Sequence, residues 1–180
     1  METKRLVFSG SGGQGVITAA IILAEAAALF EGLEAVQSQS YGPEARGGAT
    51  RSDVIISNRP VHYPKVGEPN ILVCLTQEAY NRYSGIIRPG GLLLADSRHV
   101  QTRRNVDARH VSLPMYKEVV NRLAQPVVFN ICVLGALLGL TELVHVAALM
   151  SSLEKRLPPR LLPVNRQALE LGLELGKAAV

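Results

Sequence analysis

Short apolar runs, each bounded by glycine, proline or polar residues, recur along the first two thirds of the chain. Runs of four to eight apolar residues without a polar face are typical of buried strands. They predict strands at residues 6–8, 35–39, 51–57, 71–75 and 92–95, and a weaker one at 108–112. The turn Asn58-Arg59-Pro60 suggests a hairpin partner near Val61 for the strand before it.

Longer segments between and after these runs have the length and composition of helices. They predict helices at about 14–30, 76–83, 115–124, 130–140, 143–157 and 165–177. Thr76 is placed to cap the second helix. Strands and helices alternate first, and a helical part follows after Pro114. This order indicates a single domain over residues 1–180, of α/β class, with three layers (α/β/α) and a mostly parallel, mixed sheet.

Two of the predicted helices have almost no polar face. Only Thr18 and Glu25 are polar between residues 16 and 30, and none is polar between 131 and 140. A surface helix normally carries a broad polar face. Each helix is therefore either sandwiched inside the domain, where Gly135 and Gly139 permit close approach, or covered by another chain. We favour the partner interface, because a domain of this size has little room for two helices buried all round.

The charge pattern argues against nucleic acid as a ligand. The chain has 180 residues, a formal net charge of +4 and 4% aromatic residues, and its basic residues are scattered. A nucleic-acid-binding domain should show a concentrated basic face with aromatic side chains for stacking. A mild positive charge is better suited to a ligand that carries phosphate groups.

Cysteine usage limits the cofactors that the chain can hold. The two cysteines, Cys74 and Cys132, lie in apolar runs, and no C-x-x-C motif occurs. We expect no iron–sulfur cluster or zinc site in this chain alone, and two free thiols suit a reducing cytoplasm. The apolar runs are too short for a signal peptide or a membrane span, so we also expect no membrane association.

The first candidate site is a glycine-rich turn between a strand and a helix. It contains Gly10, Gly12 and Gly15 in the spacing G-x-G-x-x-G. Such a turn lets the backbone approach a ligand, and the helix N-terminus favours an anion. A dinucleotide site also needs an acidic residue at the end of the second strand, where Ser38 and Gln39 stand instead. Turn packing without a ligand remains an alternative.

The second candidate is the loop YGPEARGG at residues 41–48. Tyr41 and Arg46 are large polar groups in a turn shaped by Pro43 and two glycines, and Arg51 follows closely. Arginine can hold a carboxylate or a phosphate with two hydrogen bonds. A surface loop in which Glu44 merely pairs with Arg46 is the plainer alternative. Both candidate segments follow a strand, so we expect them to share one edge of the sheet.

No set of residues in the chain resembles a catalytic apparatus. The four histidines are dispersed, and no Ser-His-Asp set, Cys-His pair or carboxylate pair stands out. Asp96 follows a strand and is placed either to face the crevice or, as we favour, to cap the next turn. Thr18 is more suited to bonding its own helix than to binding a ligand. We predict no catalytic residue and no metal ligand in this chain.

The motifs together resemble a known family. GGQG followed by YGPE-x-RGG, then PNILVCLTQEAYNRY, PGGLLLADS, NICVLGALLGLTEL and NRQALELGLELG, are similar to the γ subunit of 2-oxoacid:ferredoxin oxidoreductases. The similarity follows the order of the chain over nearly its whole length. It implies an oxidoreductase subunit (EC 1.2.7 class) whose complex converts a 2-oxoacid, coenzyme A and oxidised ferredoxin to acyl-CoA, CO2 and reduced ferredoxin.

The resemblance also implies the partners and the surface that meets them. Thiamine diphosphate, Mg and 4Fe–4S clusters would belong to α- and β-type subunits and a ferredoxin-like subunit of a hetero-oligomer, with external ferredoxin as acceptor. This chain would help to cover or bind coenzyme A as co-substrate. The residues facing coenzyme A, its phosphates or a partner would be Gly12, Gly13, Gln14, Gly15, Tyr41, Gly42, Pro43, Glu44, Arg46, Gly47, Gly48 and Arg51.

Three alternatives stay open at this point. The chain could be a stand-alone nucleotide- or CoA-binding module, or a purely structural assembly subunit. It could also be the corresponding subunit of an indolepyruvate ferredoxin oxidoreductase, which has a similar GGQG turn.

Overall fold

One six-stranded sheet organises the molecule. The computed structural model describes residues 2–40, 49–103 and 106–180. The strands are β1 (Lys4–Gly10), β2 (Glu34–Ser40), β3 (Thr50–Ser57), β4 (Ile71–Cys74), β5 (Gly91–Asp96) and β6 (Ala108–Leu113), arranged in the order β2-β3-β1-β4-β5-β6. All six strands that the sequence predicts are present.

The sheet is parallel except for one strand. β1, β4, β5 and β6 run parallel, whereas β3 is antiparallel to both of its neighbours, β1 and β2. The predicted mixed sheet is confirmed. The predicted hairpin partner near Val61 is wrong, because residues 58–70 contain no strand. β3 already has hydrogen-bonded neighbours on both sides, so no edge remains there for a further strand.

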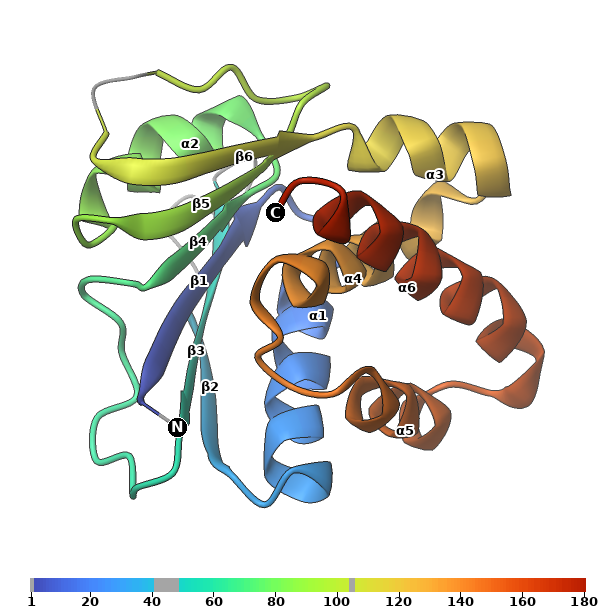
Figure 1. The fold of residues 1–180 in the computed structure, drawn as a ribbon, viewed down its shortest axis with the longest axis horizontal. Coiled ribbons are helices and arrows are strands. Elements are labelled where there is room, and N and C mark those ends of the chain that lie inside the picture. The colour runs from blue at the N-terminus through green and yellow to red at the C-terminus, as the bar shows by residue number, and fades with distance from the viewer. Residues whose placement is uncertain (1, 41–48, 104–105) are drawn as a thin grey trace.

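The helices lie unequally on the two faces of the sheet, as Figure 1 shows. Of the α-helices in the described residues, one face carries α2 (Gln77–Tyr83) alone. The other carries α1 (Val16–Glu25), α3 (Met115–Leu123), α4 (Phe129–Thr141), α5 (Val146–Arg156) and α6 (Leu162–Lys177). Short turns of helix, η1 (Ala26–Phe30), η2 (Ser84–Ile86), η3 (Pro126–Val128) and η4 (Pro159–Leu161), join these elements. The predicted three-layer α/β/α class is confirmed.

Side chains alternate between two cores along the central strands. Leu6 and Phe8 of β1 pack into the large core beneath the helical bundle, whereas Val7 packs into a smaller core on the α2 face. This alternation follows from the period of two in a strand. Because both faces of the central strands are covered, their sequences are almost uninterrupted apolar runs.

The expectation that a partner chain covers the two apolar helices is wrong for α4 and for most of the first helix. Every residue from Phe129 to Gly139 in α4 is buried by the chain itself, which packs α1, α3 and α6 around it. In α1, only Thr18 is exposed, whereas Leu29 and Phe30, at the end of the predicted first helix, are exposed apolar side chains. The layer of several helices on one face of the sheet buries such apolar helices, which the argument from the size of the domain had judged difficult.

Glycine lets α4 and α6 approach closely. A Cβ atom added at Gly139 would lie 2.8 Å from the carbonyl oxygen of Leu173, and one added at Gly135 would meet the carbonyl of Leu169. The α6 residues Gly172 and Gly176 make the reciprocal contacts, against the carbonyls of Cys132 and Ala136. The close approach expected at Gly135 and Gly139 is thus confirmed, and its partner is another helix of the same chain.

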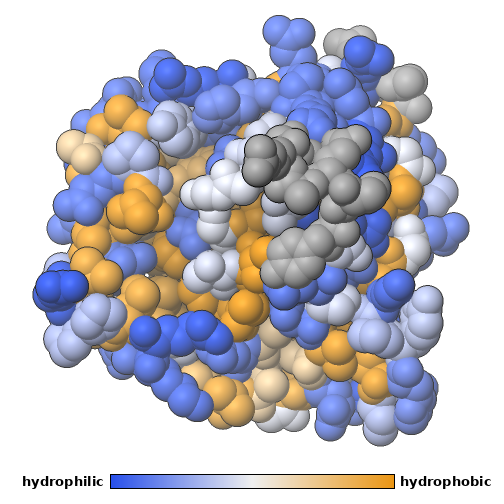
Figure 2. All heavy atoms as spheres, turned by 180° about the vertical axis from the view of Figure 1, so that it is seen from behind, coloured by the Kyte–Doolittle hydropathy of each residue, from blue (hydrophilic) through white to orange (hydrophobic). Residues whose placement is uncertain are grey.

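The exposed surface carries both hydrophilic and hydrophobic side chains. Seen from behind in Figure 2, hydrophilic side chains dominate the upper part of the face, and hydrophobic ones gather toward its middle and lower parts. The large apolar side chains that are exposed include Leu29, Phe30 and Val146. In the part of the chain that the structure describes, no helix has the length and hydropathy needed to cross a membrane.

Candidate functional site

The glycine turn leads from β1 into α1. Gly13 and Gly15 have positive φ angles, of 87° and 72°, which other residues rarely adopt. Among the residues that the structure describes, a Cβ atom added at Gly12 or Gly13 would meet no atom within 4 Å. Packing against these residues therefore does not require glycine at position 12, and both glycines are exposed. Open space around Gly12 is what close approach of a ligand or another chain needs.

Gln14 ties the turn to the neighbouring strand. Its side-chain oxygen Oε1 accepts a hydrogen bond from the Ser11 N–H at 2.8 Å, and its Nε2 donates to the carbonyl of Leu75 at 3.3 Å. Gly10 leaves room for this side chain, because a Cβ there would lie 2.5 Å from Oε1. Gln14, which the sequence assigned to the ligand-facing surface, also holds the turn in shape.

Asn130 supports the other end of the turn. A Cβ atom at Gly15 would lie 2.6 Å from Asn130 Nδ2, and this nitrogen donates to the Gly15 carbonyl at 3.4 Å. Sequence analysis missed Asn130. The only signal was a single asparagine at the start of an otherwise apolar helix. The contact fixes the beginning of α1 against the beginning of α4.

The N-terminus of α1 opens at this turn. The first regular helical hydrogen bond runs from the Ala19 N–H to the Gly15 carbonyl at 2.9 Å, and the first turn of α1 contains no acidic residue. Backbone N–H groups at such an end, together with the helix dipole, favour an anion. Thr18 is exposed within this first turn.

The second predicted segment, Tyr41 to Gly48, lies outside the described residues. Its flanking strands show where it begins and ends. Ser40 of β2 pairs with Arg51 of β3, and Arg51 pairs with Ser9 of β1. The residues that flank the segment therefore lie at the edge of the sheet where β1 enters the glycine turn. The expectation that the two segments share this edge stays a prediction. The roles proposed for Tyr41, Gly42, Pro43, Glu44, Arg46, Gly47 and Gly48 stay predictions.

Arg51 is engaged within the chain. Its Nε and Nη2 donate to the two carboxylate oxygens of Asp53 at 2.7 and 3.0 Å, and Nη2 also donates to the Val66 carbonyl. Asp53 is 4% exposed and accepts a further hydrogen bond from the Val66 N–H at 2.9 Å. The guanidinium lies 5.4 Å from the centre of the Tyr83 ring. Arg51 thus anchors the loop before β4, and its predicted ligand-facing role is untested.

Asp96 and Thr76, the two predicted capping residues, have hydrogen-bond partners within the chain. Asp96 is fully buried, accepts hydrogen bonds from the Arg98 N–H and from His99, and accepts one from the Tyr116 N–H at the start of α3. The capping role favoured for Asp96 is confirmed. Thr76 caps α2 as predicted, because its hydroxyl accepts from the Ala79 N–H at 3.2 Å.

The two thiols are poor nucleophiles and poor metal ligands. Cys74 and Cys132 are fully buried and free. Burial raises the pKa of each thiol to about 12, so both are protonated at neutral pH. Within the described ranges, no group of three or more His, Cys, Asp or Glu side chains is placed to hold a metal ion.

Comparison with known proteins identifies the class to which this fold and turn belong. A family model described as pyruvate ferredoxin/flavodoxin oxidoreductase matches residues 5–175. The 2-oxoglutarate synthase subunit KorC of Methanocaldococcus jannaschii is 43% identical over 176 residues, which cover 97% of this chain and 94% of that protein. The chain therefore belongs to the pyruvate ferredoxin/flavodoxin oxidoreductase family.

Solved structures narrow the class to one kind of subunit. The γ subunit of a keto/oxoacid ferredoxin oxidoreductase from Geobacter sulfurreducens superimposes with a TM-score of 0.88 at 40% identity, covering 98% of this chain and 99% of that one. The fold also matches a 2-oxoglutarate:ferredoxin oxidoreductase from Magnetococcus marinus, solved with 2-oxoglutarate, coenzyme A and succinyl-CoA bound. There the TM-score is 0.89 at 22% identity, over all of this chain and 32% of that one. The γ-subunit resemblance stated from the motifs is confirmed.

Proposed function

We propose that this γ subunit serves a complex that oxidises 2-oxoglutarate. The observation that carries the proposal is its 43% identity, over nearly the full length of both chains, to a 2-oxoglutarate synthase subunit. The complex would convert 2-oxoglutarate, coenzyme A and oxidised ferredoxin to succinyl-CoA, CO2 and reduced ferredoxin. A reducing cytoplasm is the compartment that its two free thiols favour.

The reaction needs groups that partner chains would supply. Thiamine diphosphate, Mg and 4Fe–4S clusters fit α- and β-type subunits and a ferredoxin-like subunit. The described part of this chain does not fit them, because its two cysteines are buried and protonated and no group of three or more His, Cys, Asp or Glu side chains there could hold a metal ion. Bound in the partners, these groups would supply decarboxylation and electron transfer.

The edge at the glycine turn is the part of this chain that we propose to face coenzyme A. Gly12 and Gly13 leave open space beside the N-terminus of α1, whose N–H groups suit a phosphate. Gln14 and Asn130 hold the turn on either side. Preorganised backbone donors need no rearrangement when the anion arrives, so the chain would position coenzyme A without a catalytic residue of its own.

Substrate-dependent reduction of ferredoxin by the intact complex tests the proposal. The complex would be purified anaerobically from its host and assayed with coenzyme A and 2-oxoglutarate, pyruvate, 2-oxoisovalerate or indolepyruvate. We expect 2-oxoglutarate to give the highest kcat/KM. We also expect turnover to fall when this subunit is removed and to return when it is added back. Preference for another 2-oxoacid would contradict the proposed substrate, and isolation of this chain without partners would contradict the complex.

A further inference from the structure

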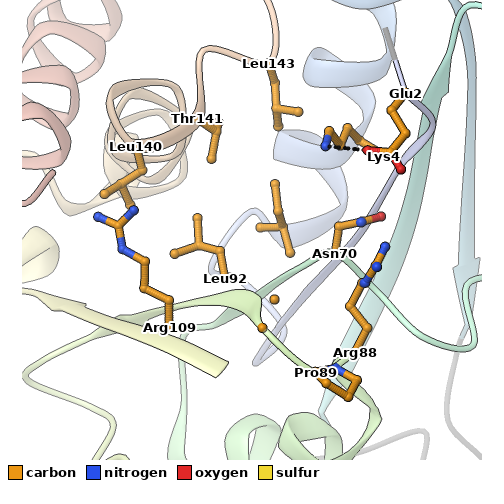
Figure 3. Close-up of a pocket in the computed structure, with 13 residues that line it drawn as sticks. Glu2, Lys4, Asn70, Arg88, Pro89, Leu92, Arg109, Leu140, Thr141 and Leu143 are labelled. Atoms are coloured by element: carbon orange, nitrogen blue, oxygen red, sulfur yellow. Dashed lines mark ion pairs between the residues drawn. The ribbon is translucent and has the colours of Figure 1, made fainter. Parts of the chain in front are cut away.

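A hollow lies at the edge of the sheet opposite the glycine turn, where the parallel strands begin. It has a volume of about 470 Å³. Figure 3 shows side chains that converge on it from β1, β4, β5, β6 and the end of α4. Neither of the two candidate sites in the sequence, nor the proposed role in binding coenzyme A, uses this edge.

The hollow combines an apolar floor with a cationic rim. Leu92 of β5 lies near its centre in Figure 3, and the buried side chains of Ile71 and Leu143 also line it. In Figure 3, Arg88 and Arg109 stand on opposite sides of Leu92. Both arginines are exposed. An apolar floor between two guanidinium groups suits an apolar side chain that is flanked by carboxylates.

The rim cations have spare bonding capacity. Lys4 Nζ lies 3.5 Å from Glu2, and Arg109 Nη2 donates to the Ala179 carbonyl at 3.1 Å. Among the residues that the structure describes, no carboxylate pairs with Arg88 or Arg109. Arg122 and Arg156, on the helical layer, each form a two-bond pair with a glutamate of this chain. The arginines of the hollow are therefore available to acidic groups from outside.

The cationic surface continues beyond the hollow. Three neighbouring hollows share Arg5 or Arg88 with it or with one another, and Arg59 and Lys65 extend the surface toward the α2 face. Together the four hollows are lined by six lysines and arginines, against two glutamates. A small anion would occupy one hollow only, whereas a polypeptide segment would contact several at once.

We propose that this edge docks an acidic segment of another subunit of the same oxidoreductase, with an apolar side chain seated over Leu92. The inference rests on the proposed function, since it takes the chain to be part of a complex. Arginine is enriched at the energetic centres of protein interfaces, because it forms planar hydrogen-bonded pairs and covers apolar surface. Docking here would leave the glycine turn, at the far edge, free to face coenzyme A.

Charge reversal in the assembled complex tests the proposal. Arg88→Glu and Arg109→Glu, made singly and together, should weaken retention of this subunit by about tenfold or more in dissociation constant, measured by native mass spectrometry on dilution. Arg88→Ala should have a smaller effect in the same direction. The association of the unaltered complex should weaken with added salt, and the double variant should lose most of that dependence.

Arg160→Glu is the matched control, since Arg160 is an exposed arginine on η4 that lines none of the four hollows. It should leave retention unchanged. Equal retention of the Arg88, Arg109 and unaltered subunits would overturn the proposal, as would a saturable effect of phosphate or 2-oxoglutarate on retention that disappears with Arg88→Glu. Failure of the unaltered chain to join any complex would instead contradict the proposed function.

Discussion

Glycine serves opposite purposes in two regions of this molecule. Between α4 and α6, a Cβ atom added at Gly172 would collide with the backbone of Cys132, and Gly135, Gly139 and Gly176 are equally confined. At the turn before α1, a Cβ added at Gly12 would meet no described residue within 4 Å. Packing inside the chain explains the first group, whereas packing against the described residues does not explain Gly12.

The contrast separates structural glycines from a candidate binding glycine. Glycine inside a helix costs about 1 kcal/mol relative to alanine, and the close contact of α4 with α6 offsets that cost. Gly12 has no positive φ, and none of the described residues confines it. The described part of the fold therefore permits a larger side chain at position 12, which makes Gly12 a candidate for contact with a ligand or a partner.

Gly172→Ala should give the largest effect. The new methyl group would press on backbone atoms of α4, which cannot move aside as a flexible side chain would. We expect a loss of about 3 kcal/mol in the free energy of unfolding, the upper range for overpacking a core, measured by denaturant unfolding. Gly85→Ala is the control, since a Cβ at Gly85 meets nothing within 4 Å. A stable Gly172→Ala variant would show that the two helices can move apart without cost.

Gly12→Leu should affect function without affecting stability. No described residue obstructs the side chain, which would fill the space beside the N-terminus of α1. In the assembled complex we expect the KM for coenzyme A to rise about tenfold, equivalent to about 1.4 kcal/mol, with kcat nearly unchanged. Gly85→Leu is the matched control and should leave both constants unchanged. An unaltered KM in the Gly12→Leu variant would contradict the proposal that coenzyme A binds at this edge of the sheet.

Glu25→Gln should give the smallest effect, at the contact of α1 with α5 and through charge rather than volume. Arg156 Nε donates to Glu25 at 2.6 Å, which ties α5 to α1. Hydrogen bonds from Arg156 lower the pKa of the Glu25 carboxyl, although burial opposes the shift. We expect a loss of less than about 1 kcal/mol at pH 7, because the pair is partly exposed.

The pH dependence of that loss provides a check. A carboxyl whose pKa is lowered on folding stabilises the protein fully above its unfolded-state pKa of 4.5, and the contribution disappears as the pH falls through the lowered folded value. The difference in unfolding free energy between the unaltered chain and Glu25→Gln should therefore be constant at neutral pH and vanish in acid. A difference that persists unchanged in strong acid would contradict the role of the ion pair.

Local sequence patterns predicted the elements well and some of their contacts poorly. The strands and helices lie close to their expected ranges, and Thr76 and Asp96 cap turns as expected. The prediction of a strand near Val61 that pairs with β3 was wrong because strand pairing depends on which edges of the sheet remain free. The prediction that another chain covers the apolar helices was wrong because burial depends on how many layers of the same chain cover a helix. Asn130 was missed because its contact with Gly15 joins residues 115 positions apart.

For the candidate site too, local sequence patterns predicted some features and not others. Glycine spacing after a strand was enough to indicate the turn, and the order of motifs was enough to indicate the γ-subunit family. Neither could show that Gln14 bonds to the end of β4, or that Arg51 is paired with Asp53. The Gln14 contact reaches a neighbouring strand, where the alignment of strands decides which groups meet. Arg51 and Asp53 are two residues apart in β3, and Val66, from a segment further along the chain, bonds to both side chains and holds the pair in place.

By itself, the sequence determined the element order, the α/β class, the family and the glycine turn, because these depend on residue types a few positions apart. Only the tertiary structure decided that β3 runs against its neighbours, that α4 is buried by its own chain and that cationic side chains gather at the far edge. Each of these depends on contacts between distant segments. Their free energies come from packing and charge in three dimensions, which local periodicity does not record.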